Sequence, residues 1–184
     1  MVYDQYGYPY YYYPPGYGWE GQPVYGTYPD QADWSGQTNS YRYPISTPLT
    51  DYGPQPFVIN INAATKQNNT FRTALWTGKH LQVTLMSINP GEDIGLEIHP
   101  EVDQFLRIEQ GRGMVQMGSD PNNLSYQRHV FDDSAIMIPA GTWHNVTNTG
   151  NIPLKLYSIY APPNHPFGTV HPTKADAEAA EGGQ

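Results

Sequence analysis

The chain has 184 residues, which is enough for one domain and an extension. Its formal net charge of −8, with nine lysines and arginines in all, argues against a nucleic acid partner, because phosphate binding needs clustered cations. No apolar run reaches the length of a membrane span, the N-terminus lacks the pattern of a secretory signal, and the absence of cysteine excludes disulfides. We therefore expect a cytoplasmic protein with neither a nucleic acid nor a membrane partner.

Residues 1–50 differ in composition from the rest of the chain. They are rich in tyrosine, proline, glycine and glutamine, and they hold few aliphatic residues. Such a segment cannot assemble a core, so we predict that it is disordered. It is either a solubilising extension or an interaction tail, since tyrosine rings stack and phenols cross-link by oxidation. Its composition resembles the tails of surface-layer and spore-coat proteins, which predicts assembly partners and, as the alternative location, a spore coat or another surface layer.

Short β-type runs separated by turns begin at residue 56. They predict roughly eight to ten strands, among them 57–61, 71–76, 80–88, 104–109, 113–117, 135–138, 143–146 and 154–160. No helical period accompanies them, so the sequence predicts an all-β antiparallel sandwich or jelly roll.

One short helix is expected near the C-terminus. Thr173 followed by Asp176 resembles a capping box, and the alanine- and glutamate-rich residues after it suit a helix that glycines 182 and 183 would stop. The expected organisation is a disordered tail over residues 1–50, a β domain over 56–163, and a C-terminal loop and short helix over 164–184.

Glu97 and His99 stand two residues apart in the stretch 91–111. In a strand they would share a face, while their neighbours point the other way. Across a turn, Gln104 opens the next strand and can return to meet them. Three groups able to bind a metal would then converge from one hairpin.

A second stretch, 133–148, carries a proline–glycine turn that delivers His144 to the start of a strand. With it the chain resembles the cupin family, whose two motifs are matched in order and spacing. The first motif falls on Gly91, Glu97, His99, Gln104 and Gly111, and the second falls on Asp133, Pro139, Gly141, His144 and Asn148. Asp133 stands where the family has glycine. The resemblance implies a double-stranded β-helix, or jelly-roll barrel, over about residues 56–163.

The resemblance also implies a ligand set for one divalent metal ion. Carried over by position, the ligands are Glu97, His99, Gln104 and His144, with Glu97 replacing a histidine and Gln104 replacing the glutamate. Asp103 is the alternative ligand to Gln104 if the shorter spacing of the motif applies. One carboxylate, two imidazoles and an amide oxygen suit Zn, Mn, Fe or Ni. The competing interpretation is a barrel that has lost its metal, although a buried carboxylate and histidine are costly unless coordinated.

His165 and His171 lie in a proline-containing loop after the last predicted strand. A loop there can fold over the mouth of the barrel and supply an acid–base group, because histidine titrates near neutrality. These two residues are the candidate catalytic groups, and an ordinary ordered tail is the alternative.

Three functions are compatible with this pattern, and the sequence leaves open whether the protein is an enzyme. The first is a metal-dependent isomerase of sugar phosphates, because residues 97–100 resemble the Gln-x-His-Pro pair of type I mannose-6-phosphate isomerases. Its small-molecule substrate would need cations, for which the candidates are Arg72, Lys79, Arg107 and Lys155. The second is an Fe(II)-dependent dioxygenase, and the third is a structural or binding protein of a surface or spore-coat assembly.

A homodimer is expected, since cupins of this size commonly pair through edge strands. Residues 57–61 and the segment from 71 are the predicted edge.

Overall fold

The computed structural model describes residues 2–3, 9–10 and 47–181. The chain divides into two units, Met1–Arg42 and Tyr43–Gln184. In the first unit, β1 (Val2–Tyr3) pairs antiparallel with β2 (Pro9–Tyr10). The predicted disorder of the tail concerns residues that lie mostly outside the described ones.

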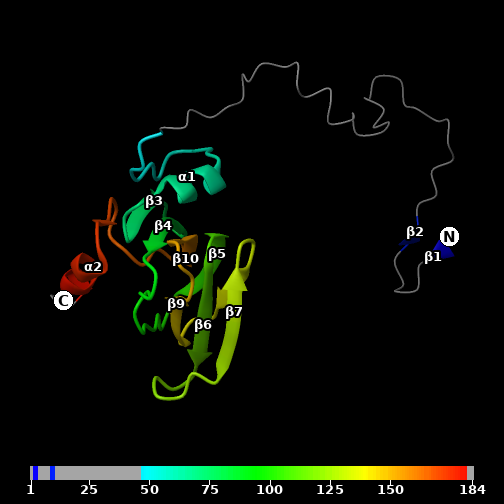
Figure 1. The fold of residues 1–184 in the computed structure, drawn as a ribbon. Coiled ribbons are helices and arrows are strands. Elements are labelled where there is room, and N and C mark those ends of the chain that lie inside the picture. The colour runs from blue at the N-terminus through cyan, green and yellow to red at the C-terminus, as the bar shows by residue number, and fades with distance from the viewer. Residues whose placement is uncertain (1, 4–8, 11–46, 182–184) are drawn as a thin grey trace, which may run out of the picture. The chain divides into compact units, whose positions relative to one another are not determined.

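The second unit is built from two antiparallel sheets. The larger has the order β11-β3-β4-β10-β5-β8 and the smaller has the order β7-β6-β9. The strands of the larger sheet are β3 (Arg72–Thr77), β4 (Gln82–Ile88), β5 (Asp103–Gln110), β8 (Ala135–Ile138), β10 (Leu154–Ala161) and β11 (Val170–His171). Those of the smaller sheet are β6 (Arg112–Gly118), β7 (Tyr126–Phe131) and β9 (Trp143–Asn148). The all-β jelly-roll class is confirmed, and Figure 1 shows the strands of this unit.

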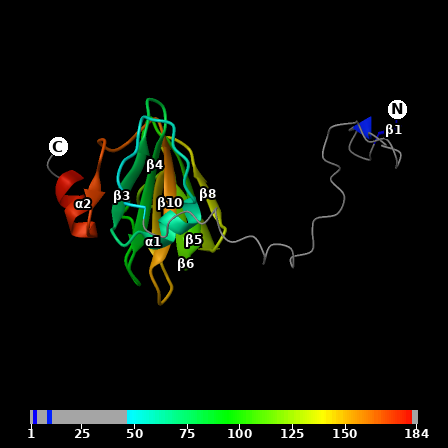
Figure 2. The same ribbon diagram turned by 90° about the horizontal axis from the view of Figure 1, so that it is seen from above.

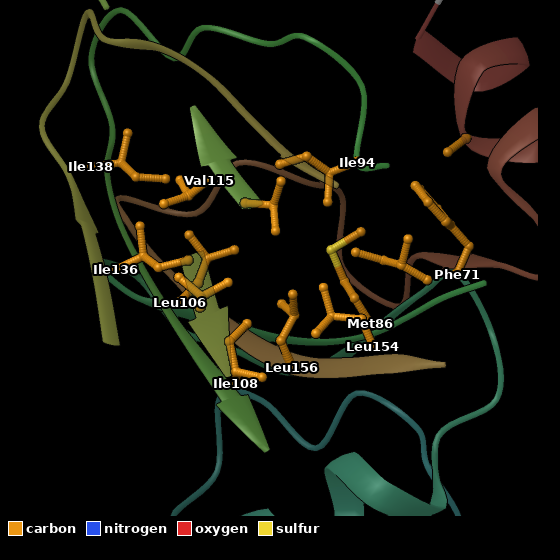
Figure 3. Close-up of a cluster of buried hydrophobic side chains, with 14 residues drawn as sticks. Phe71, Met86, Ile94, Leu106, Ile108, Val115, Ile136, Ile138, Leu154 and Leu156 are labelled. Carbon is orange, nitrogen blue, oxygen red and sulfur yellow. The ribbon is translucent and has the colours of Figure 1, made fainter. Parts of the chain in front are cut away.

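The interior of the barrel is apolar at one end and polar at the other. In β10, Leu156 is followed two residues later by Ser158 and then by Tyr160, and all three are fully buried. The neighbouring strand β4 changes from apolar to polar at the same level, because Leu156 pairs with Met86 and Ser158 pairs with Thr84. Figure 3 shows the apolar end, where side chains from several strands meet. The described members of this cluster are Phe71, Met86, Ile88, Ile94, Leu106, Ile108, Val115, Val130, Ile136, Ile138, Val146, Leu154, Leu156 and Ala177.

Residues 57–61 do not form the predicted strand, and that prediction was wrong. Alternating apolar residues suggested a strand, but Asn60 acts as a helix N-cap. Its side chain accepts a hydrogen bond from the backbone N–H of Ala63 at 3.0 Å, and α1 (Ile61–Gln67) begins there. Figure 2 shows α1 lying across the larger sheet. Pairing between two copies stays a prediction, without a strand over 57–61 to provide the edge.

The helix α1 covers the outer face of the larger sheet with a second apolar cluster. Ala64 of the helix packs with Leu75 of β3 and Leu85 of β4, and all three are buried. Because β4 also buries Met86 on its opposite face, the strand is covered on both sides. This explains why its sequence does not show a simple alternation of polar and apolar residues.

The C-terminal helix α2 (Lys174–Glu181) confirms the predicted short helix and its capping box. The backbone N–H of Thr173 donates to Asp176 Oδ2 at 2.9 Å, and the N–H of Asp176 donates to Thr173 Oγ1 at 3.3 Å. Across the described residues, no helix has the length and apolar character that a membrane crossing needs.

Strand β7 was missed from the sequence. Only Val130 of its six residues is buried, so the apolar alternation that marks other strands is absent there. Its place in the sheet comes from backbone pairing with β6, in which Met114 lies opposite His129.

Candidate metal centre

The two motif segments are joined by direct backbone pairing. Glu97 and His144 form an antiparallel bridge in which the N–H of each donates to the carbonyl of the other at 3.0 Å. The N–H of Gly141 also donates to the carbonyl of His99 at 2.8 Å. The backbone partner of Glu97 is therefore His144, and the predicted hairpin between Glu97 and Gln104 does not position the carboxylate. Gln104 lies in β5 instead, between Tyr160 of β10 and Ile138 of β8.

The turn before His144 has the backbone that the motif requires. Gly141 has a positive φ of 75°, which favours glycine. Asp133, at the position where the family has glycine, also has a positive φ of 65°. Aspartate tolerates this left-handed region better than most residues, so the departure from the motif keeps the same backbone path.

Glu97, His99 and His144 bring one possible ligand atom each into a single cluster. These atoms all lie within 4.8 Å of one another. Glu97 Oε1 is 3.4 Å from His144 Nε2 and 3.7 Å from His99 Nε2. The side chain of His144 is fully buried, and those of His99 and Glu97 are 11% and 16% exposed. The spacing is that of groups around one ion.

The ring of His144 is oriented by a backbone contact. Its Nδ1 lies 2.9 Å from the carbonyl oxygen of Thr142, and a carbonyl only accepts, so Nδ1 carries the proton. The other nitrogen, Nε2, faces the carboxylate of Glu97 at 3.4 Å. Neither His144 Nε2 nor His99 Nε2 has a hydrogen-bond partner within the described part of the chain. A cation between these atoms would satisfy all of them, and a backbone carbonyl on the far nitrogen is a usual support for a metal-bound histidine.

Glu97 is held in its ionised form, as a ligand must be. Burial alone would raise its pKa, but the interactions with His144 and His99 and the positive charge of Arg72 outweigh burial and hold the pKa well below its usual range. Arg72 Nη2 lies 4.0 Å from Glu97 Oε2, and the arginine is itself buried. The carboxylate thus turns one oxygen toward the histidines and the other toward the guanidinium.

Gln104 is buried and presents an unused acceptor. Its Nε2 donates to Ser158 Oγ at 3.0 Å, which leaves Oε1 without a hydrogen-bond partner among the described residues. In β5 it shares the inward face with Leu106 and Ile108, so it lies inside the barrel. Its role as a fourth ligand stays a prediction.

Asp103, the alternative to Gln104, has a different environment. It is exposed at the start of β5, and its Oδ1 accepts a hydrogen bond from the N–H of Ala140 at 2.9 Å. The structure therefore places Asp103 against the turn that precedes His144, outside the cluster of three ligand atoms.

His165 lies beside the cluster, in the loop after β10. Its ring stands edge-on to Tyr160 at 5.0 Å between centroids, and Tyr160 in turn stands edge-on to His99 at 5.7 Å. Burial, together with the charge of Arg72, lowers the pKa of His165 to about 3, so its imidazole is neutral at pH 7. His171 lies in β11, where it pairs with Arg72 of β3.

The position of His165 is fixed by Gln82, a residue that no sequence motif selects. The amide oxygen of this fully buried side chain accepts from the N–H groups of Asn164 and His165 at 3.2 and 2.9 Å. Its Nε2 donates to the carbonyl of His165 at 2.9 Å. Tyr160 was also missed as a site residue, because in the sequence it is only the last residue of a predicted apolar strand.

Of the four predicted cation candidates, Arg72 alone adjoins the cluster. Arg107 pairs with Glu109 and Asp133, and Lys79 is exposed. The ammonium of Lys155 donates to the carbonyls of Lys66 and Asn68 at the end of α1. The sequence does hold a signal for this role, because Arg72 is the one charged residue in the predicted strand 71–76.

Comparison with known proteins agrees with this fold. A family model described as a cupin domain matches residues 84–160. The uncharacterized protein YrkC of Bacillus subtilis is 68% identical over 165 residues, covering 88% of this chain and 89% of that protein. The uncharacterized protein L612 of Acanthamoeba polyphaga mimivirus is 42% identical over 118 residues, covering 63% of this chain and 71% of that protein.

Solved structures give the same result. The crystal structure of BH2720 from Bacillus halodurans has 72% sequence identity and a TM-score of 0.71, and it covers 71% of this chain and 99% of that one. A double-stranded β-helix protein from Klebsiella pneumoniae, at 18% identity and a TM-score of 0.51, covers 64% of this chain and 98% of its own and shares the fold alone.

Proposed function

This chain belongs to the cupin family, and we propose that it binds one divalent metal ion through Glu97, His99 and His144. The observation that carries the proposal is the convergence of Glu97 Oε1, His99 Nε2 and His144 Nε2, which all lie within 4.8 Å of one another, while neither ring nitrogen has a hydrogen-bond partner among the described residues. A metal ion among these three atoms would satisfy both ring nitrogens and the carboxylate at once. The contact of His144 Nδ1 with the carbonyl oxygen of Thr142 orients the ring with Nε2 toward the cluster, which suits a metal ligand.

The ligand set leaves room for a substrate. One carboxylate and two imidazoles provide three ligands, and Gln104 Oε1 is the candidate for a fourth. Such a set suits Zn, Mn, Fe or Ni, and a bound ion of this kind polarises a carbonyl or hydroxyl oxygen as a Lewis acid. Glu97, His99 and His144 would hold the ion, and the ring of His165 lies close by, edge-on to Tyr160 at 5.0 Å between centroids.

The reaction that we propose first is the isomerisation of a sugar phosphate. It requires a Lewis acid, a group that moves a proton between neighbouring carbons, and a cation for the phosphate. The cluster would supply the Lewis acid and Arg72 the cation, and His165 is the candidate proton carrier, although its pKa of about 3 makes it a weak base. Aldose–ketose interconversion should be assayed over a set of sugar phosphates with Zn or Mn. Failure of the loaded protein on every substrate would contradict this reaction.

A specific feature also favours a second reaction, an Fe(II)-dependent dioxygenation. Two histidines with one carboxylate form the ligand arrangement of non-haem iron oxygenases, which keep open positions for oxygen and substrate. Oxygen consumption by the ferrous protein over aromatic and keto-acid substrates tests it. No consumption with any of them would remove this candidate.

The metal itself is tested apart from any activity. The purified wild-type protein should carry metal, and a variant that combines His99→Ala with His144→Ala should carry almost none. His129→Ala is the matched control, because His129 is an exposed histidine of β7 outside the cluster. Equal and negligible metal in all three proteins would overturn the proposal.

A further inference from the structure

A hollow of about 450 Å³ lies between two strands that belong to different sheets. Strand β7 pairs with β6 alone and β8 pairs with β5 alone, so in the described part of the chain each has one edge without a strand beside it. The hollow occupies the gap between these two edges, and residues of β6, β7 and β8 line it. Glu97, His99 and His144 are not among its lining residues, so this hollow is separate from the metal centre.

The hollow is closed at the end where β7 turns into β8. Residues 132–134 join the two strands directly. The N–H of Ser134 donates to the carbonyl of Phe131 at 2.9 Å, and the N–H of Asp133 donates to the carbonyl of Ile108 in β5 at 3.0 Å. The turn is thereby tied to the larger sheet, and Ser134 lines the hollow. A strand of another chain that entered the gap would run into this turn, so a blind-ended hollow of this volume suits a small molecule.

The gap widens with distance from the turn. Val130, Arg128 and Tyr126 alternate along β7, so their side chains share the face that is turned toward the barrel interior. Val130 is buried in the apolar core, Arg128 is exposed, and Tyr126 is 47% exposed. The inner face of β7 is therefore covered near the turn and open to solvent farther along.

Apolar side chains form the inner wall of the hollow, and a cation stands at its open end. Val115 and Ile136 belong to the apolar core, and Met117 packs against that core. Val115 lies opposite Arg128 in the pairing of β6 with β7, so the apolar wall and the cation are one strand spacing apart, about 4.8 Å. Arg128 is the one lysine or arginine among the described lining residues, and none of these is an aspartate or a glutamate. In a chain of net charge −8, such a hollow is a local exception.

Two contacts hold the guanidinium of Arg128 in place. Its central carbon lies 4.5 Å from the ring centroid of Tyr126, and its Nη1 donates to the carbonyl of Gln127 at 2.7 Å. Neither contact is with a carboxylate. A guanidinium has five N–H groups, so this exposed side chain keeps donors that an oxyanion can use, and stacking on a ring does not block them.

We propose that the hollow between β7 and β8 binds a small amphipathic anion. Its aromatic or alkyl body lies against Met117 and Ile136, and its single terminal oxyanion, a carboxylate or a phosphate, is bound by Arg128. Burial of the apolar body supplies most of the affinity, and the charge-assisted hydrogen bonds select a ligand with a charged end. The site does not depend on the proposed metal ion.

The test follows the binding of small probes to the full chain by amide chemical shifts in NMR. Phenylacetate, hexanoate and phenyl phosphate carry both a body and an oxyanion, 2-phenylethanol carries the body alone, and acetate carries the charge alone. The variants are Arg128→Met and Tyr126→Ala, which removes the ring under the guanidinium. Arg112→Met is the matched control, because Arg112 is an exposed arginine at the start of β6 that does not line the hollow. Each titration is repeated with added Zn²⁺.

We expect saturable binding of phenylacetate or hexanoate at millimolar concentration, with the largest shifts at Met117, Arg128 and Ile136. The affinity should exceed that of 2-phenylethanol and acetate at least about threefold, because an exposed charge pair contributes modestly. Arg128→Met should remove the preference for the acid over the alcohol, Tyr126→Ala should reduce it, and Arg112→Met should keep it. A higher affinity for phenyl phosphate than for phenylacetate would identify the oxyanion as a phosphate.

Three results would overturn the inference. They are the absence of saturable binding of all three amphipathic anions, an acid preference that survives Arg128→Met, and shifts that map outside the hollow. Binding that appears only with Zn²⁺ would contradict the independence of the two sites. Absence of metal from the protein would count against the metal centre alone, because the zinc-free titrations test the hollow by themselves.

Discussion

Glu97 and His144 lie directly opposite each other in an antiparallel bridge, and their side chains meet at 3.4 Å between Oε1 and Nε2. Two backbone hydrogen bonds of 3.0 Å fix this pairing. The first and second motif segments are thus held in one register by the main chain, before any ion binds. A slip by one residue would turn one of the two side chains to the opposite face and abolish the cluster. The site is preorganised by the sheet, which is the property that a precise ligand set requires.

Substitution of Gln104 tests whether its amide is a fourth ligand. Gln104→Glu should raise the affinity for a divalent ion at least 10-fold, because a carboxylate adds charge where a neutral oxygen stood. Gln104→Leu should lower it. Competition with a metal chelator measures both, and Gln127→Glu on the exposed strand β7 is the control. Equal affinity in all four proteins would show that Gln104 only supports the fold through Ser158.

Gln82→Leu should release the loop that carries His165. Two backbone N–H groups lose their acceptor, and each buried donor left unpaired costs about 1–3 kcal/mol. We expect the free energy of unfolding to fall by about 2–4 kcal/mol in chemical denaturation. Gln127→Leu, a surface change, should leave it nearly unchanged. A Gln82→Leu protein as stable as the wild type would contradict the role that its hydrogen bonds suggest.

The depressed pKa of His165 makes stability depend on pH. With a folded pKa of about 3 against an ordinary 6.5, the unfolded chain takes up a proton first as the pH falls. The contribution of His165 is fully present above pH 6.5 and is lost progressively from there toward pH 3. Between pH 6.5 and 5 the wild type should therefore lose stability faster than His165→Gln. Urea unfolding at several pH values measures the difference, and parallel curves for the two proteins would refute it.

Removal of the N-terminal unit distinguishes an enzymatic function from a role in an assembly. Deletion of residues 1–42 should leave metal content and melting temperature unchanged, because the described contacts of the β domain begin later. Gln67 Nε2 donates to the carbonyl of Thr47 at 3.1 Å, and Leu49 packs against the cluster under α1. Deletion through residue 50 should therefore lower the melting temperature. Loss of metal or turnover on deleting 1–42 would count against a self-sufficient site, and loss of association alone would favour the structural alternative.

The sequence predicted most of the strands because their turns and apolar runs are local signals. It failed where a local signal had two meanings. The alternation at 57–61 looks like a strand until Asn60 is recognised as a helix cap, and only the packing of Ala64 on Leu85 decides the matter. Strand β7 has no apolar face that the sequence could show. Its register is set by backbone pairing with β6.

The same distinction applies to the site. Motif spacing selected Glu97, His99 and His144, which the fold brings together. It could not reveal that Glu97 pairs with His144 rather than with Gln104, because strand order is a property of the whole sheet. Nor could it select Gln82 and Tyr160, whose importance comes from contacts with the distant His165.

The most direct test of the metal centre is anomalous scattering from a crystal of the metal-loaded protein, at the absorption edge of the bound metal. The account predicts one strong peak at about 2.0–2.2 Å from Glu97 Oε1, His99 Nε2 and His144 Nε2. A crystal grown with Zn²⁺ or Mn²⁺ that shows no peak among these three atoms, or a peak elsewhere only, would contradict it.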